Sequence, residues 1–304
     1  NKRRIIVKSN ANGSFITYIM IMNMFKASEV IEIFLKYDIS NTKDESKYEI
    51  SELDGITNTS LVVSVDNKKF VLRIPGKNPD VINRLSEKHN STKALEYGLT
   101  IPYLIFDENT GIKISRYFDI YTYKASDFKN ENMRNNAFNV LNKLHNSDLV
   151  FQNNFSPLRV FQEIADTSNS IEQEAKEVGF KIVKRLNEIG ISNHPCHQDL
   201  YSGNFILYND ETYLIDWEYS SMGDKYFDYA DLFWQNEFDL DKNLRKEALN
   251  EIGISNKDEI EKFEIFEILS MITWGLWALK RSPNDNDGQV ALNKAIKLCK
   301  DKKL

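Results

Sequence analysis

The pattern of the chain changes near residue 120, and this change most constrains its fold. Before it, short runs of β-branched and aromatic residues alternate with turn residues. After it, apolar residues recur at helical spacing over long stretches. A small β-rich part followed by a larger helical part predicts an α+β fold.

The expected elements follow from these patterns. In the first part we expect a helix over 27–37, strands over 48–53, 60–65 and 69–74, a helix over 80–97, and strands over 103–107 and 112–117. Asp66-Asn67 is a plausible hairpin turn between the second and third strands. In the second part we expect helices over 132–145 and 158–186, a hairpin over 205–208 and 212–215, and helices from 228 to 302.

The N-terminal residues 1–26 are expected to form an irregular extension ahead of the fold. The apolar stretch over 15–25 is too short to span a bilayer and lacks a convincing cleavage site, so no stable membrane insertion is expected. The two lobes are expected over 27–117 and 118–304.

Composition narrows the class of function. The chain has 304 residues and a net charge of −6, which argues against a nucleic-acid surface because phosphate binding needs clustered Lys and Arg. The only cysteines are Cys196 and Cys299, which suit neither a zinc finger nor a disulfide framework. A reducing, cytoplasmic location is expected.

One segment carries the strongest chemical signal. Residues 197–204, HQDLYSGN, precede the later hairpin, and Ile215-Asp216-Trp217 ends it. Phosphoryl transfer needs a group that orients and deprotonates a hydroxyl, and oxygen ligands that hold Mg²⁺ on the phosphates. Asp199 suits the first task, and Asn204 and Asp216 suit the second. Each residue alone is common in turns, so the signal lies in the spacing.

This segment resembles the catalytic loop of the protein-kinase-like small-molecule kinases. These are the choline/ethanolamine kinases, including the bacterial lic type, and the aminoglycoside phosphotransferases. The resemblance covers about residues 50–280. It implies a two-lobed fold with ATP between the lobes, Asp199 as the catalytic base, and Asn204 and Asp216 as Mg²⁺ ligands. His197 and Asp228 are expected to support the loop, although Asp228 also suits a helix N-cap.

The resemblance extends to an ATP site. The expected ATP-binding residues are Gly55, Thr57, Asn58, Arg73, Glu87, Ile114, Ser115 and Tyr117. The first three lie in a loop that resembles the family's phosphate-covering loop, although an ordinary hairpin loop has similar residues. Arg73 lies inside an apolar strand, where a cation needs an anionic partner. Glu87 is the expected partner, with a solvated helix charge as the alternative.

The acceptor is predicted from aromatic residues. Residues 274–277, WGLW, resemble the helix of choline kinases whose tryptophans help to enclose the substrate. A quaternary ammonium has no N–H to donate, so it is recognised by aromatic faces and nearby carboxylates. The expected choline-binding residues are Trp274, Trp277, Glu218, Tyr219 and Tyr226. Ordinary core packing is the alternative for two tryptophans on an apolar helix.

The leading prediction is therefore a choline kinase that uses ATP and Mg²⁺ and makes phosphocholine and ADP. Ethanolamine or an aminoglycoside is the alternative acceptor within the same class. A kinase-fold binding protein without catalysis is the alternative of another class. The sequence does not predict an oligomeric state.

Overall fold

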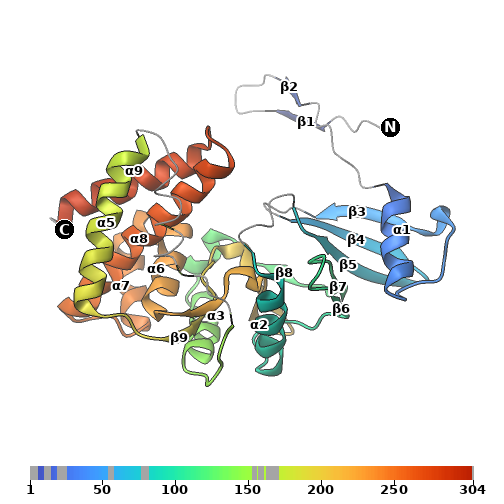
Figure 1. Ribbon diagram of the computed structural model, residues 1–304, viewed down its shortest axis with the longest axis horizontal. Coiled ribbons are helices and arrows are strands. Elements are labelled where there is room, and N and C mark those ends of the chain that lie inside the picture. The colour runs from blue at the N-terminus through green and yellow to red at the C-terminus, as the bar shows by residue number, and fades with distance from the viewer. Residues whose placement is uncertain are drawn as a thin grey trace. The chain divides into compact units, whose positions relative to one another are not determined.

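A computed structural model describes residues 6–9, 15–18, 26–53, 58–76, 82–152, 156, 161 and 171–302 (Figure 1). The chain divides into two compact units, Asn1–Arg73 and Ile74–Leu304, which are described separately. This division falls before the lobe boundary expected near residue 117, and that boundary remains a prediction. No helix within the described ranges combines the length and apolar content of a membrane span.

The first unit begins with a hairpin that the sequence analysis did not expect. β1 (Ile6–Ser9) and β2 (Phe15–Tyr18) pair antiparallel, with Ile6 opposite Tyr18. The expectation of an irregular extension is therefore wrong for these two segments. Both segments contain β-branched or aromatic residues, which favour strands.

The rest of the first unit packs a helix on strands. The strands β3 (Glu49–Leu53), β4 (Thr59–Val65) and β5 (Lys68–Ile74) are hydrogen-bonded in this order. Helix α1 (Ala27–Lys36) buries Phe34 edge-on against Phe70, with ring centroids 5.5 Å apart. The Asp66-Asn67 turn is confirmed, since both residues have positive φ (52° and 58°), as a type I′ hairpin requires. A short 3₁₀ helix, η1, covers Glu45–Lys47.

The second unit is mainly helical, as expected. Its helices are α2 (Arg84–Glu96), α3 (Glu131–His145), α5 (Ile171–Ile189), α6 (Lys225–Gln235), α7 (Lys242–Glu251), α8 (Lys257–Arg281) and α9 (Asn286–Lys302). Its short 3₁₀ helices are η2 (Ala125–Lys129), η3 (Ser202–Asn204), η4 (Trp217–Tyr219) and η5 (Phe238–Leu240). The first half of the helix expected over 158–186 falls largely outside the described residues.

The strands of the second unit are short. β6 (Ile105–Phe106) pairs with β7 (Lys113–Arg116), and β10 (Phe205–Tyr208) lies between β11 (Glu211–Leu214) and β8 (Tyr121–Thr122). A further pair joins β9 (His194–Cys196) and β12 (Ser221–Gly223). The sequence analysis missed β8, β9 and β12, because two or three residues are too few to show a strand period.

Helix α8 lies at the centre of the helical group, with α5, α6 and α9 packed on it (Figure 1). Gly275 of α8 permits a close contact with α9. A Cβ at this position would lie 3.0 Å from the carbonyl oxygen of Gly288 and 2.8 Å from a Leu292 methyl group. The glycine inside the WGLW motif is thus explained by close helix packing.

Candidate active site

The candidate catalytic loop, residues 197–204, lies between two strand pairs. β9 leads into it beside β12, with Cys196 opposite Ser221, and the β10–β11 hairpin leaves it. At the far end of the hairpin, the Ile215 N–H donates to the Asn204 carbonyl at 3.0 Å. This bond holds Ile215, the residue before Asp216, beside Asn204. The two predicted Mg²⁺ ligands therefore lie near each other at the open end of the hairpin.

Helix α6 holds the start of the loop through Asp228. The His197 N–H donates to Asp228 Oδ2 at 2.9 Å, and the Gln198 N–H donates to Oδ1 at 2.8 Å. The buried carboxylate thus fixes the backbone that leads to Asp199, and Gln198 there adopts a positive φ of 73°. Asp228 is not the N-cap of α6, because Asp224 accepts from Tyr226 N–H and caps the helix.

His197 supports the loop from its other side. Its Nε2 lies 3.0 Å from the Ile215 carbonyl oxygen, and its ring lies against Trp217 at a centroid distance of 4.8 Å. Burial is the main effect on its pKa and lowers it, so the imidazole is neutral with the proton on Nε2. A neutral ring that donates to a carbonyl suits a supporting role rather than proton transfer.

Asp199 and Asn204 contact each other directly. Asn204 Nδ2 donates to the Asp199 carbonyl at 2.9 Å and to Asp199 Oδ2 at 3.1 Å. The amide oxygen of Asn204 therefore faces away from Asp199 and can ligate a cation. Desolvation, followed by the charges of Asp231, Asp216 and Glu218, raises the pKa of Asp199 well above its ordinary value. A raised pKa makes a carboxylate a stronger base.

Asp216 belongs to a group of three carboxylates. It has a left-handed backbone (φ 65°, ψ 66°), a strained conformation for a residue that is not glycine. Ligand oxygens of Glu87, Asp216 and Glu218 all lie within 4.8 Å of one another. Arg84 Nη1 approaches Glu87 at 2.5 Å and Glu218 at 3.2 Å. These carboxylates and the Asn204 amide are the hard oxygen ligands that Mg²⁺ prefers, so the donor set fits the ion.

Glu218 and Glu87 therefore lie beside the predicted metal ligand Asp216. The choline-binding role expected for Glu218 remains a prediction. Glu87 is fully buried, and Arg84 and Lys113 Nζ, at 3.4 Å, neutralise it. The alternative of a solvated helix charge is wrong. The expected pair of Glu87 with Arg73 joins the two units and remains a prediction.

The other expected ATP-binding residues are spread over both units. Gly55 and Thr57 lie outside the described residues, and Asn58 and Arg73 belong to the first unit. In the second unit, Ile114 is fully buried, and its carbonyl oxygen accepts from Leu104 N–H at 2.7 Å. A carbonyl oxygen has a second lone pair, so the adenine contact expected at Ile114 remains a prediction.

Ser115 and Tyr117 are the other two residues whose backbone is predicted to contact the adenine. Ser115 lies in β7 and is half-buried, whereas Tyr117 follows the strand and is exposed. The adenine contact expected at both residues remains a prediction.

Three aromatic side chains form the candidate acceptor wall. Tyr219 and Trp274 meet edge to face with centroids 5.1 Å apart, and Trp274 and Trp277 do the same at 5.9 Å. Tyr219 directly follows Glu218 in η4. Desolvation, then the charges of Glu218, Asp199 and Asp216, raises the pKa of Tyr219. Arg281, 5.0 Å from the Trp277 centroid, covers part of that ring.

Tyr226 is not part of this aromatic wall. It lies in the first turn of α6, where the Lys262 ammonium is 5.1 Å from its ring centroid. Lys262 precedes Trp274 by twelve residues on α8, which corresponds to about 18 Å along a helix. The ring of Tyr226 thus lies beside Lys262, and its expected choline-binding role remains a prediction.

The structure adds residues that the sequence analysis did not assign. Arg84 joins two of the acidic residues, and Asp231 contacts the catalytic loop. His145 is the last residue of α3. Its Nε2 lies 2.8 Å from Asp228 Oδ2, so it donates to the carboxylate that supports the loop. Asp231 could have been noticed in the sequence because it is an acidic residue within an apolar stretch of α6.

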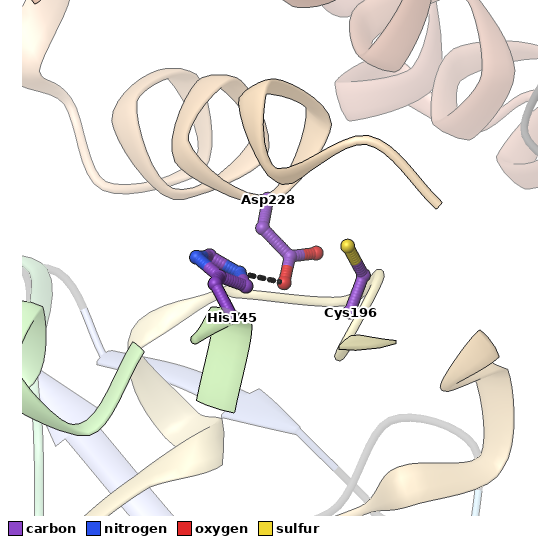
Figure 2. Close-up of side chains that lie close together, drawn as sticks. All are labelled: His145, Cys196 and Asp228. Atoms are coloured by element: carbon purple, nitrogen blue, oxygen red, sulfur yellow. Dashed lines mark hydrogen bonds and ion pairs between the residues drawn. The ribbon is translucent and has the colours of Figure 1, made fainter. Parts of the chain in front are cut away.

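Figure 2 shows His145, Asp228 and the buried Cys196 close together. These are metal-binding residue types, but their chemistry favours a structural role. Asp228 already accepts three hydrogen bonds. Burial and then the charge of Asp228 raise the pKa of the Cys196 thiol, whereas metal binding needs the thiolate.

Comparisons with known proteins agree with this geometry. The family model described as choline/ethanolamine kinase matches residues 50–263. Protein LicA of Haemophilus influenzae is 29% identical over 277 residues, which cover 83% of this chain and 80% of that protein. The crystal structure of choline kinase LicA from Streptococcus pneumoniae matches with a TM-score of 0.76 and 27% identity, over 90% of this chain and 99% of the other. A structure of LicA in complex with AMP matches with a TM-score of 0.75 and 26% identity, over 91% and 99%. The expected protein-kinase-like α+β fold is thereby confirmed.

Proposed function

Because the chain belongs to the choline/ethanolamine kinase family, we propose that it is a choline kinase that transfers the γ-phosphoryl group of ATP to the choline hydroxyl. The products are phosphocholine and ADP. The proposal includes a cytoplasmic location, where ATP is available.

The aromatic wall beside the acidic residues carries this proposal. Tyr219, Trp274 and Trp277 form two edge-to-face contacts, and Tyr219 directly follows Glu218, whose carboxylate lies within 4.8 Å of that of Asp216. Aromatic faces attract a trimethylammonium group, which cannot donate hydrogen bonds, and a favourable ring contributes about 0.5–2 kcal/mol. The hydroxyl of choline lies only two carbons from this cation, and we propose that an acceptor held on the wall presents this hydroxyl to Asp199.

Asp199 is the proposed catalytic base. Asn204 donates to Oδ2 and orients the carboxylate, so Oδ1 is the atom that takes the proton of the choline hydroxyl. The hydroxyl oxygen forms a bond to the γ-phosphorus while the bond from this phosphorus to the bridging oxygen of ADP breaks. Asp228 and His197 hold the loop backbone during this step.

Asn204 and Asp216 are the proposed Mg²⁺ ligands, with Glu218 close enough to assist. Mg²⁺ supplies positive charge that offsets the charge of the phosphates. Asn58 and Arg73 are proposed to contact the phosphates from the first unit, together with Gly55 and Thr57. The backbone near Ser115 and Tyr117 is proposed to bind the adenine.

The test is ADP release from ATP and Mg²⁺ with choline, N,N-dimethylethanolamine, ethanolamine or an aminoglycoside as acceptor. We expect kcat/KM to be highest for choline and to fall as methyl groups are removed. Asp199→Asn should lower kcat about 10²–10⁴-fold with every acceptor. A preference for ethanolamine or an aminoglycoside would overturn the choline assignment and leave the kinase activity in place. No ADP release with any of them would favour a binding protein without catalysis.

A further inference from the structure

Helix α6 contacts the catalytic loop on both sides of Asp199. Asp228 binds the backbone before it, as described above. After it, the Leu200 N–H donates to Asp231 Oδ2 at 2.7 Å, and Asn236 Nδ2 donates to the Leu200 carbonyl at 2.9 Å. Asp228 and Asp231 are three residues apart, so they lie on the same face of α6. The base is thus flanked by two backbone segments that are fixed by one helix.

Asp231 also contacts the helix that bears the aromatic wall. Ser270 Oγ donates to Asp231 Oδ1 at 2.5 Å, and Gln235 Nε2 donates to Oδ2 at 2.8 Å. Ser270 Oγ in turn accepts from Trp234 Nε1 at 2.8 Å. Ser270 precedes Trp274 by one turn of α8. A continuous set of hydrogen bonds therefore joins the residue after Asp199 to the helix of Trp274.

A carboxylate at the position of Asp231 has a cost in desolvation free energy. Asp231 is fully buried, and a buried carboxylate is tolerated only when hydrogen bonds satisfy it. Burial raises the pKa of Asp231 to about 7, and its charge adds to those that face Asp199. A neutral core residue would avoid this cost but would leave the Leu200 N–H buried and without an acceptor.

We propose that Asp231 is a positioning residue: through Leu200 and Ser270 it fixes Asp199 relative to the aromatic wall on α8. The proposal rests on the proposed kinase function for its effect on turnover. Asp231 affects the distance between the base and the acceptor hydroxyl, so it affects kcat rather than the binding of either substrate. A misplacement of about 1 Å at a reacting group can lower the rate about 100-fold.

The test compares Asp231→Ala with Asp231→Asn. Alanine removes the acceptor of Leu200 N–H. Asparagine keeps an acceptor oxygen for Leu200 and Gln235, and its Nδ2 can donate to Ser270 Oγ. We expect Asp231→Ala to lower kcat about tenfold or more with each KM within about twofold, and Asp231→Asn to restore kcat to within about threefold of the original chain.

Glu267→Gln is the matched control. Glu267 of α8 is, like Asp231, a buried carboxylate, and its ion pair joins Arg245 of α7 at 2.7 Å. We expect it to lower stability without lowering kcat. Equal loss of kcat in Asp231→Ala and Glu267→Gln would mean a general structural effect and would overturn the proposal. A kcat for Asp231→Asn as low as that for Asp231→Ala would also overturn the proposal.

A second measurement does not depend on turnover. The amide hydrogen of Leu200 should exchange with solvent about tenfold faster or more in Asp231→Ala than in Asp231→Asn, because only alanine leaves it without an acceptor. Equal exchange in the two variants would overturn the proposal. The kinetic assays are run with whichever acceptor the original chain phosphorylates. A failure of the choline assignment can therefore be distinguished from a failure of the positioning role of Asp231.

Discussion

Replacing Asp228 with Asn tests how strongly α6 holds the catalytic loop. Three donors converge on this carboxylate: the N–H groups of His197 and Gln198, and Nε2 of His145. An amide has one acceptor oxygen, so its Nδ2 must face at least one former donor. If the oxygen faces Gln198, His145 can change tautomer and accept from Nδ2, but the His197 N–H cannot.

One buried backbone N–H is therefore left without an acceptor in Asp228→Asn. Such a group costs about 1–3 kcal/mol. We expect the free energy of unfolding to fall by about this amount, and kcat to fall because the segment before Asp199 is displaced.

Urea unfolding followed by the fluorescence of the four tryptophans measures the first effect, and ADP release measures the second. Asp231→Asn is the comparison, because Leu200 supplies the only backbone N–H that binds that carboxylate among the described residues. Equal urea midpoints for Asp228→Asn and the original chain would refute the hydrogen-bond count.

Three further predictions follow from other parts of the second unit. Trp274→Ala should raise the KM for choline about 2- to 30-fold, since it removes about 0.5–2 kcal/mol of cation–π attraction, and should leave the KM for ATP unchanged; an unchanged choline KM would contradict the aromatic wall. Gly275→Ala should lower the free energy of unfolding by about 1–3 kcal/mol, because its Cβ would meet the Gly288 carbonyl at 3.0 Å, and a thermal-shift assay that shows no change would contradict this contact. The pKa of Asp231 is raised from 3.8 to about 7, so the folded state favours the protonated form; its contribution to stability should fall as pH rises from about 4 to 7 and then level off. Urea midpoints for the original chain should therefore fall relative to those for Asp231→Asn across this range, and parallel profiles would contradict the shifted pKa.

The fold was largely predictable because its long elements carry strong periods. α1, α3 and the β10–β11 hairpin lie within a residue or so of their expected ends. The two-residue strand β8 and the β9–β12 pair have too few residues to show a pattern, and they form because distant segments meet. The β1–β2 hairpin was missed because each of its strands has only four residues, too few to show a clear period.

The candidate site divides in the same way. The spacing of Asp199, Asn204 and Asp216 identified the loop because these residues are close in sequence. Glu218 and Tyr226 were assigned by their position after Asp216, and sequence distance alone cannot say which partner a side chain finds. Glu218 lies with Asp216 and Glu87, and Tyr226 lies with Lys262. Contacts over long separations, such as Arg84 with Glu218, leave no local pattern to read.

The anchoring of the loop on α6 also has a consequence for local unfolding. The amides of His197, Gln198 and Leu200 all donate to side chains of one helix rather than to a neighbouring strand. An irregular segment would ordinarily open by small fluctuations of its own, at low free energy. Here the segment opens only when its hydrogen bonds to Asp228 and Asp231 break, and both acceptors are held by α6, which is packed on α8 in the core. The loop should therefore belong to the most stable cooperative unit of the second unit, even though it has almost no regular structure.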